Sequence, residues 1–410
     1  MNKKRILVVS QHYWPEPFRI NDMVQGFVAD GIEVDVLCGL PNYPKGEWFP
    51  GYRYSGPRRQ QQDGVQIVRA GEIPRKGNSG PMIFLNYVSW PLFALFSLPR
   101  LHGPYDAVLC YNTSPVLMSL PAILYGKLHH VPVINYVLDT WPENLYSVLP
   151  VSSPFWQRVA EKVSDWHYKK ADRLIAMSPS LQQRLMQRTG KPAGDVAVIP
   201  QYCEDFYAVP VPSPELELRY GGHFNLVFTG NFSPAQSLPT VIRAAVQTRQ
   251  MGADDLRLLL VGDGMSRGEL EALVDQLDAR STVTFCGSVP PEQVPAYTSL
   301  ASGLVASLSG SPDLGMTVPA KVASYMAAAK PLLVSMDGEG AAAARACGNL
   351  ASPAGDVDAL AQNMLALYGM SAEERAQMGR DAFDYYAAHY RRDQLLQQLE
   401  TFILTGNEVP

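Results

Sequence analysis

The sequence is poor in cysteine, and its few thiols are not spaced for a metal site or a disulfide framework. The five residues are Cys38, Cys110, Cys203, Cys286 and Cys347, and none of them belongs to a CxxC pair. An odd number of scattered thiols indicates free cysteines in a reducing compartment. The HExxH, GxSxG and catalytic-cysteine motifs of many hydrolases are also absent. We therefore predict a cytoplasmic protein and expect no metal.

The sequence also lacks an excess of positive charge. It has 34 Lys and Arg residues against 39 Asp and Glu residues, which gives a formal net charge of −5 at pH 7. General nucleic-acid binding needs a basic surface, so no nucleic-acid partner is expected. The composition is globular, with 47% apolar and 18% charged residues. A globular chain of 410 residues is too long for one ordinary core, which predicts two domains.

Long hydrophobic runs are missing as well. The apolar run at 6–9 follows a basic start but is too short for the core of a signal peptide, and a buried strand explains it better. The apolar stretch at 82–99 falls short of the ~20 residues that a spanning helix needs. It also contains Asn86 and Pro91. We expect a buried or interfacial helix there.

The sequence does contain a regular alternation of strand-like and helix-like segments. This alternation predicts parallel α/β sheets. It is interrupted at 208–222 by a stretch rich in Pro and Gly, which is typical of a linker. We therefore predict an α/β protein with two Rossmann-like, doubly wound domains facing a cleft. The domains are expected at 1–205 and 206–385, followed by a C-terminal helix at 386–410 that can return to the N-terminal domain.

Glycines follow two predicted strands of the second half. The first strand ends in Gly230-Asn231, and the next one ends in Gly262-Asp263-Gly264. Backbone N–H groups in such turns, together with a helix N-terminus, can hold a phosphate. Each motif alone is better explained as an ordinary strand-to-helix turn, because neither a full GxGxxG nor a Walker lysine is present.

A helix crowded with small residues is predicted within 318–331. Lys321 lies in its first turn, where the helix dipole disfavours a cation unless an anion offsets it. For a helix taken alone, a solvated lysine is the simpler explanation. Lys321 therefore marks a candidate anion site only together with the other motifs.

Two segments of the first half carry side chains that are typical of a site. Asp139 stands at the carboxyl end of a predicted central strand, where ligands of α/β sheets bind. An Asp before a turn also commonly caps a helix, so both explanations stay open. The loop at 11–19 is more aromatic than an ordinary surface loop, which favours a binding role.

Taken together, these motifs resemble family 4 glycosyltransferases, which have the two-domain GT-B fold. The bacterial O-antigen and capsule branch that includes fucosamine transferases is the most similar. The resemblance covers nearly the whole chain and depends on the order of motifs that are weak one by one. The motifs are Trp14-Pro15-Glu16, Leu138-Asp139-Thr140-Trp141-Pro142-Glu143, Gly230-Asn231 with Ala235-Gln236, Gly262-Asp263-Gly264, and Pro319-Ala320-Lys321 with Tyr325-Met326-Ala327.

The resemblance implies a retaining transfer of a sugar from a nucleotide-diphosphate donor, without a metal or cofactor. It assigns the donor to the C-terminal domain and the acceptor to the N-terminal domain. Lys321 is then expected to offset the charge of the leaving diphosphate, and Asp139 to face the donor sugar or the acceptor hydroxyl, which makes these two the predicted catalytic residues. The predicted donor-binding residues are Gly230, Asn231, Gln236, Gly262, Asp263 and Ser324, and the predicted acceptor-side residues are Glu16, Arg19 and Asn112.

The sequence departs from the family pattern at the donor site. Many family members have two glutamates, eight positions apart, that embrace the donor, whereas Met316 and Ser324 stand at these positions here. The usual basic residue beside the Gly230 turn is absent, and Gln236 is nearby instead. These departures make Lys321 a more important candidate for donor binding. They also leave the residues that contact the nucleotide less defined.

The resemblance also implies the substrates. The donor is expected to be a UDP-linked N-acetylated sugar, and the acceptor a saccharide linked to a polyprenyl diphosphate. A nucleotide-sugar 2-epimerase of the same fold and a non-catalytic assembly subunit are the open alternatives, although the 318–331 segment fits a transferase better than an epimerase. A donor-binding measurement tests the subunit, and product analysis with and without an acceptor tests the epimerase.

The uncharged stretch at 82–98 fits a membrane surface as well as a buried core. It is rich in aromatic residues, which favour the headgroup zone of a bilayer. Arg75 and Lys76 precede it and Arg100 follows it, and basic residues favour anionic lipid. A helix that is apolar all round fits a buried position almost equally well. We therefore expect either a core helix or a peripheral contact with the inner face of the cell membrane.

Overall fold

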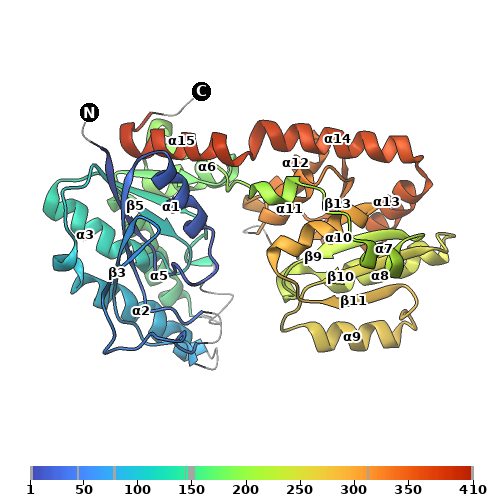
Figure 1. The fold of residues 1–410 in the computed structure, drawn as a ribbon, viewed down its shortest axis with the longest axis horizontal. Helices are drawn as coiled ribbons and strands as arrows, with labels where there is room; N and C mark the ends of the chain where they lie inside the picture. The colour runs from blue at the N-terminus through green and yellow to red at the C-terminus, as the bar shows by residue number, and fades with distance from the viewer. Residues whose placement is uncertain are drawn as a thin grey trace. The chain divides into compact units, whose positions relative to one another are not determined.

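The computed structural model describes residues 3–43, 46–76, 80–143, 145, 153–311 and 314–407, and Figure 1 shows its elements. Contacts between Cα atoms divide the chain into two compact units, one of Met1–Ile199 with Leu396–Pro410 and one of Pro200–Leu395. Each unit has a mainly parallel sheet, which confirms the predicted fold class of two α/β domains. The boundary predicted from the sequence, at 205/206, lies a few residues beyond this division.

The first unit is built on a sheet whose described strands lie in the order β3-β4-β2-β1-β5-β6-β7-β8. The short strand β3 pairs antiparallel with β4, and the strands from β4 to β8 pair in parallel. Strand β3 was not predicted, because its Gln-rich residues are exposed or half-buried and lack an apolar pattern. The strands are β1 (Arg5–Val9), β2 (Glu33–Cys38), β3 (Arg59–Gln62), β4 (Val65–Arg69), β5 (Ala107–Asn112), β6 (Val133–Val137), β7 (Arg173–Ala176) and β8 (Val196–Val198).

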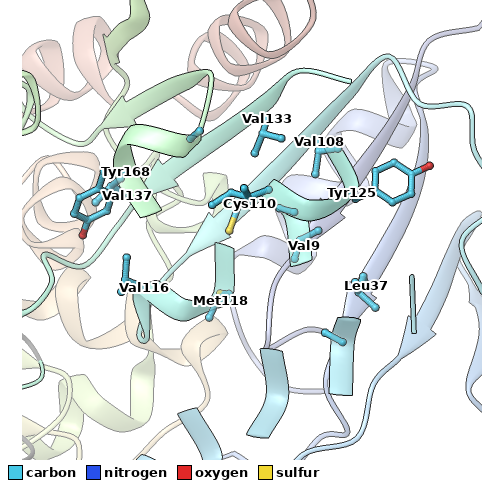
Figure 2. Packing of buried hydrophobic residues seen from close by; sticks show 14 of the residues in the cluster. Val9, Leu37, Val108, Cys110, Val116, Met118, Tyr125, Val133, Val137 and Tyr168 are labelled. Carbon is cyan, nitrogen blue, oxygen red and sulfur yellow. The ribbon is translucent and has the colours of Figure 1, made fainter. Parts of the chain in front are cut away.

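Helices α2, α3, α5 and α6 contribute side chains to one core cluster on this sheet. Figure 2 shows part of the cluster, in which Val9, Val108 and Val133 of the strands lie near Tyr125 of α3. The helices of the unit are α1 (Ile20–Ala29), α2 (Gly80–Leu95), α3 (Ser119–His129), α5 (Pro154–Lys170), α6 (Pro179–Thr189) and the end of α15 (Arg392–Thr405), with 3₁₀ turns η2 (Leu98–Arg100), η3 (Val116–Met118) and η4 (Ala193–Asp195).

The second unit has a parallel sheet whose described strands lie in the order β11-β10-β9-β12-β13-β14. Its strands are mainly apolar because helices cover both faces of the sheet. In β10, Leu258 and Leu260 point into one core cluster, whereas Leu259 and Val261 point into the other. The strands are β9 (Phe224–Thr229), β10 (Leu256–Val261), β11 (Val283–Gly287), β12 (Gly303–Ser307), β13 (Leu332–Ser335) and β14 (Leu350–Ser352).

Helices cover both faces of this second sheet, since α8, α9 and α13 line one core cluster and α10, α11, α12 and α14 line the other. The helices are α7 (Pro214–Tyr220), α8 (Leu238–Gln250), α9 (Arg267–Gln276), α10 (Val294–Leu300), α11 (Ala320–Ala327), α12 (Glu339–Ala346), α13 (Val357–Gly369) and α14 (Ala372–His389), with 3₁₀ turns η5 (Asp205–Ala208), η6 (Pro234–Gln236), η7 (Pro291–Gln293) and η8 (Leu314–Met316).

The stretch at 208–222, which the sequence analysis interpreted as a linker, contains helix α7. Ser213 caps this helix by accepting a hydrogen bond from the backbone N–H of Leu216, and Pro214 is its first residue. Proline is favourable at this position because the N–H group that it lacks would have no partner in the helix. The prolines of this segment therefore do not all mark a linker, and the linker interpretation was wrong at 214–220.

Other helices start at capping side chains in the same way. Ser178 and Asp356 accept hydrogen bonds from backbone N–H groups of the first turns of α6 and α13. Ser371 and Glu374 form a capping box at the start of α14. These contacts satisfy N–H groups that a helix leaves unpaired at its start. Among the helices of the described residues, none combines the length and apolar character needed to cross a bilayer.

Candidate active site

Lys321 is the second residue of α11 and lies beside the end of strand β9. Its ammonium donates a hydrogen bond to the side-chain oxygen of Gln236, and Nζ lies 3.8 Å from the centre of the Phe228 ring. Burial lowers the pKa of Lys321 to about 7. A partly buried ammonium that contacts an amide and a ring, in a helix first turn, is a site that an anion would stabilise.

A second contact joins α11 to the same strand end. The backbone N–H of Thr229 donates to the hydroxyl of Tyr325 over 2.7 Å, and this hydroxyl is buried. Thr229 is the last residue of β9, so Tyr325 fixes the point where the chain turns into Gly230. The motif around Lys321 and the turn at Gly230 are far apart in the sequence, and the fold brings them together.

Gln236 is held in place by its backbone. Its carbonyl oxygen accepts a hydrogen bond from the hydroxyl of Ser307, the last residue of β12. The preceding carbonyl, of Ala235, accepts from the N–H of Ser309 over 2.8 Å. The amide of Gln236 is therefore presented to Lys321 from a fixed turn.

The glycines at 230 and 262 allow two strand ends to pack closely. Both have positive φ angles, of 133° and 143°. A Cβ added at Gly262 would overlap the carbonyl oxygen of Gly230, so Gly262 has a packing role. A Cβ added at Gly230 would lie 3.3 Å from Nζ of Lys321, so Gly230 keeps the space beside the ammonium open.

The remaining predicted donor residues differ in their surroundings. Asn231 is exposed next to Gly230. Asp263 is exposed and pairs with Arg267 at 3.2 Å, and it also accepts from the N–H of Gly264. Ser324 is buried, and its hydroxyl donates to the carbonyl of Ala320 over 3.2 Å. Lys321, Gln236 and Gly230 are thus brought together, whereas Asp263 and Ser324 hydrogen-bond to other groups of the chain.

In the first unit, Asp139 lies in the loop after β6. One of its carboxylate oxygens accepts a hydrogen bond from the hydroxyl of Ser114 over 2.9 Å. The same hydroxyl accepts from the indole N–H of Trp141 over 3.0 Å. The loop after β5 thereby orients the carboxylate of Asp139, which is only partly buried.

Glu16 is buried and holds two loops together. One carboxylate oxygen accepts hydrogen bonds from the backbone N–H groups of Asn42 and Tyr43, both over 2.6 Å. The other lies 2.8 Å from Nδ1 of His12. Glu16, which the sequence analysis assigned to the acceptor side, therefore positions His12 at the end of β1.

His12 belongs to a buried polar cluster at the ends of β1 and β4. Its Nε2 lies 3.2 Å from a guanidinium nitrogen of Arg75. Nearby, Gln11 and Asn86 donate to one oxygen of Glu72 over 2.6 and 2.9 Å. Burial raises the pKa of Glu72 to about 8, so this carboxyl is protonated at neutral pH.

The other two predicted acceptor-side residues have different positions. Arg19 is the N-cap residue of α1 and is partly exposed. Asn112 is buried at the end of β5, and its carbonyl accepts from the N–H of Leu138. In the orientation that satisfies its neighbours, the amide nitrogen of Asn112 donates to the carbonyl of Thr113. Asn112 therefore joins the β5 and β6 loops.

Sequence reasoning missed several residues of these clusters. His12 lies in the loop at 11–19 but was not singled out, and none of Glu72, Ser114 and Phe228 was assigned to a site. Gln11 and His12 come shortly after β1, and Glu72 comes shortly after β4. Polar side chains just beyond the carboxyl ends of parallel strands were therefore the signal that was available.

No group of three or more His, Cys, Asp or Glu side chains in the described ranges is placed to hold a metal ion. The expectation that the site works without a metal or cofactor stays a prediction.

Both units match known families of enzyme domains. Residues 18–201 match the glycosyl transferase 4-like domain family. Residues 223–370 match the family described as glycosyl transferases group 1. The two matches together cover most of both units, in the order expected for a GT-B enzyme.

Named relatives support the same assignment. The chain is 24% identical over 312 residues to the 2-deoxystreptamine glucosyltransferase of Streptomyces kanamyceticus, which covers 72% of this chain and 76% of the relative. It is 28% identical over 137 residues to the lipopolysaccharide core biosynthesis glycosyltransferase LpsD of Rhizobium meliloti, which covers 33% of this chain and 36% of LpsD.

Solved structures share the fold over nearly the full length. Sucrose-phosphate synthase from Thermosynechococcus elongatus aligns with a TM-score of 0.74 at 16% identity, covering 98% of each chain. HepE from Anabaena in complex with UDP aligns with a TM-score of 0.68 at 13% identity, covering 97% of this chain and 98% of HepE. At these identities the similarity shows the fold, which is GT-B.

Proposed function

Starting from two glycosyltransferase domains in the GT-B fold, we propose that this protein is a retaining glycosyltransferase that uses a nucleotide-diphosphate sugar. The observation that carries the proposal is the partly buried ammonium of Lys321 beside the Gly230 turn. The lowered pKa of Lys321 means that an anionic ligand would stabilise its charged form. A diphosphate is the anion that such a donor supplies.

In this proposal Lys321 binds the diphosphate and offsets the charge that develops as the sugar leaves. The cation is positioned before the reaction by Gln236 and Phe228, so little reorganisation is needed during the chemical step. The space beside Gly230 lets a phosphate approach the ammonium. In the turn after β9, the N–H groups of Gly230 and Phe232 donate to the carbonyls of Val261 and Asp263. The N–H of Asn231, between them, is the further donor that we assign to a phosphate oxygen.

Asp139 is the residue that we assign to the sugar-transfer step on the acceptor side. Ser114 orients its carboxylate, and Trp141 orients Ser114. A carboxylate in this position can accept a hydrogen bond from an acceptor hydroxyl as that hydroxyl loses its proton. The polar cluster of His12, Glu16 and Arg75 lies at the same end of the sheet and is the candidate wall of the acceptor site.

We further propose a UDP-linked N-acetylated sugar as the donor and a polyprenyl-diphosphate-linked saccharide as the acceptor, in cytoplasmic assembly of an O-antigen or capsule. The UDP bound in HepE and the lipopolysaccharide role of LpsD are in keeping with this choice. The apolar stretch at 82–98 provides a place for contact with the inner face of the membrane.

A thermal-shift screen with UDP, GDP, ADP and their sugars tests the donor assignment, because a ligand that binds only the folded protein raises its melting temperature. We expect stabilisation by UDP and UDP-sugars, and its loss in Lys321→Met. Lys330→Met is the matched control, since Lys330 donates to the carbonyl of Ser299 and is remote from the proposed anion. Absence of any nucleotide response in the wild-type protein would favour the assembly-subunit alternative, and an altered sugar without an acceptor would favour the epimerase.

A further inference from the structure

The outward face of α5 presents aromatic side chains to solvent. Phe155, Trp156 and Trp166 are 64%, 60% and 43% exposed, and Val163 is 38% exposed. The spacing of 155, 163 and 166 puts these residues along one side of the helix. Large apolar residues gathered in this way mark an interaction surface more often than single exposed ones do.

Basic side chains lie next to this aromatic stripe. Arg158, Lys162 and Lys169 are exposed and recur at helical spacing along the neighbouring side of α5. Asp165 of the same helix forms an ion pair with Arg188 at 2.7 Å. Glu161 is the other acidic residue of α5, and it is exposed. The chain as a whole is acidic, so this positive stripe is not a consequence of composition.

Helix α2 and the residue after it present a second apolar face. Leu92 and Phe93 are 49% and 45% exposed, and Phe96 is 79% exposed. Arg100 is exposed after this face, and Arg59 donates to its carbonyl over 2.8 Å. By contrast Trp90, an aromatic residue of the same stretch, is fully buried.

Both helices hold the loop that carries Asp139. The ring of Tyr87 in α2 meets the ring of Trp141 edge-on, with their centres 5.9 Å apart. The hydroxyl of Tyr168 in α5 accepts a hydrogen bond from the backbone N–H of Trp141 over 3.1 Å. Their outward faces therefore belong to the two helices that flank the candidate acceptor loop.

We propose that α5 is an in-plane anchor that binds an anionic bilayer through its aromatic and basic stripes, with the exposed face of α2 as a second contact. An amphipathic helix with Trp and Phe on one side and Lys and Arg on the other is suited to the headgroup zone. The positive stripe complements anionic lipid and not a neutral surface. This inference rests on the proposed function, since a lipid-linked acceptor would bring the Asp139 loop to a membrane.

Co-sedimentation of the full chain with vesicles tests the anchor. The vesicles are phosphatidylcholine alone or with about 30% phosphatidylglycerol, at low and high salt, because the attraction to anionic lipid is screened by salt. We expect binding to the anionic vesicles that falls with salt. Lys162→Gln with Lys169→Gln should weaken the partition coefficient about 25-fold, at about 5-fold for each charge. Trp156→Ser with Trp166→Ser should weaken it at least about 10-fold.

The matched control is Leu218→Ser with Met265→Ser, which removes exposed apolar side chains in the second unit. We expect this variant to bind vesicles like the wild-type protein. Every variant must also keep the thermal shift with UDP, so that a failed anchor is distinguished from a failed donor assignment. Loss of UDP binding with intact vesicle binding would contradict the proposed function and leave the anchor standing.

Brominated lipids provide a second readout, because they quench the fluorescence of tryptophans that enter the bilayer. Quenching should be strong in the wild-type protein and largely absent in the Trp156, Trp166 double variant. Wild-type protein that stays in the supernatant with anionic vesicles at low salt would overturn the proposal. Equal binding to neutral vesicles would also overturn the proposal. A wild-type dimer that dissociates in the α5 variants would overturn it too, because the exposed face of α5 would then bind a second copy of the chain.

Discussion

The ammonium of Lys321 lies over the ring of Phe228, with Nζ 3.8 Å from the ring centre. The ring offsets part of the cost of burying the charge, because a cation is attracted to an aromatic face. The pKa of Lys321 is nevertheless lowered to about 7, so the ammonium is only partly protonated at neutral pH before a ligand binds. This relationship makes proton binding and donor binding interdependent.

UDP binding is expected to take up a proton above pH 7. A diphosphate beside Lys321 favours the charged form of its side chain and raises its pKa. The Lys321 side chains that are deprotonated at pH 8 therefore gain a proton when UDP binds. Calorimetry in two buffers of different ionisation enthalpy measures this uptake at pH 8. Lys321→Met should show none, whereas equal uptake in that variant would assign the proton to another group.

Lys321→Met should lower turnover on the order of 100-fold or more, because one preorganised electrostatic contact to the leaving group is lost. The variant should stay folded, since an apolar side chain of similar length replaces a partly buried charge. Steady-state kinetics and a melting curve measure the two effects. The control Lys330→Met should keep its turnover, and full activity of Lys321→Met would rule out its assigned role.

Asp139→Asn should reduce kcat on the order of 100-fold with little change in the affinity for UDP. The amide can still accept the hydrogen bond from Ser114, so the loop is preserved, but it is a poor acceptor for the proton of a reacting hydroxyl. Turnover numbers and a UDP titration on the same variant separate the two effects. A drop in melting temperature with unchanged kcat would support the capping explanation instead.

Glu72→Gln should remove a pH dependence of stability between about pH 4.5 and 8. The folded protein keeps a proton on Glu72 up to about pH 8, whereas the unfolded chain releases it near the ordinary carboxyl pKa of 4.5. The unfolded state therefore binds fewer protons, and stability falls as pH rises through this window, by at most about 1.4 kcal/mol per pH unit.

Urea unfolding of both proteins at several pH values measures this effect as a difference. Subtracting the two free energies of unfolding at each pH cancels the contribution of other titrating groups. One such group is Glu400, whose pKa is also raised to about 8 by burial and by Asp30. A constant difference between wild type and Glu72→Gln across the window would contradict the prediction.

The segment at 82–98 should respond very differently at two of its aromatic positions. Trp90→Ala should lower the free energy of unfolding by about 3–5 kcal/mol, because Trp90 is fully buried and its removal leaves a cavity. Phe93 is 45% exposed, so Phe93→Ala should have a much smaller effect. Equal losses at both positions in denaturant titrations would mean that Phe93 is as much a part of the core as Trp90.

The order of strands and helices could be predicted from the sequence because buried parallel strands are continuously apolar. The apolar run at 6–9 lies in β1, and the strands predicted before Gly230 and Gly262 are β9 and β10. Elements held mainly by the backbone were not predictable in this way. Strand β3 has a polar sequence and pairs through its main chain. Helix α7 begins at Pro214, within the stretch that was interpreted as a linker.

The sequence alone determined the fold class, because strand periodicity is a local property. It also marked Lys321 as a candidate anion site, whose role stays a prediction. Only the tertiary structure decided what surrounds them. It brought Phe228 and Gln236 to Lys321, buried Glu72 against Asn86, and turned Trp90 inward while leaving Phe93 outside. These outcomes depend on contacts between segments far apart in the chain, which no local pattern encodes.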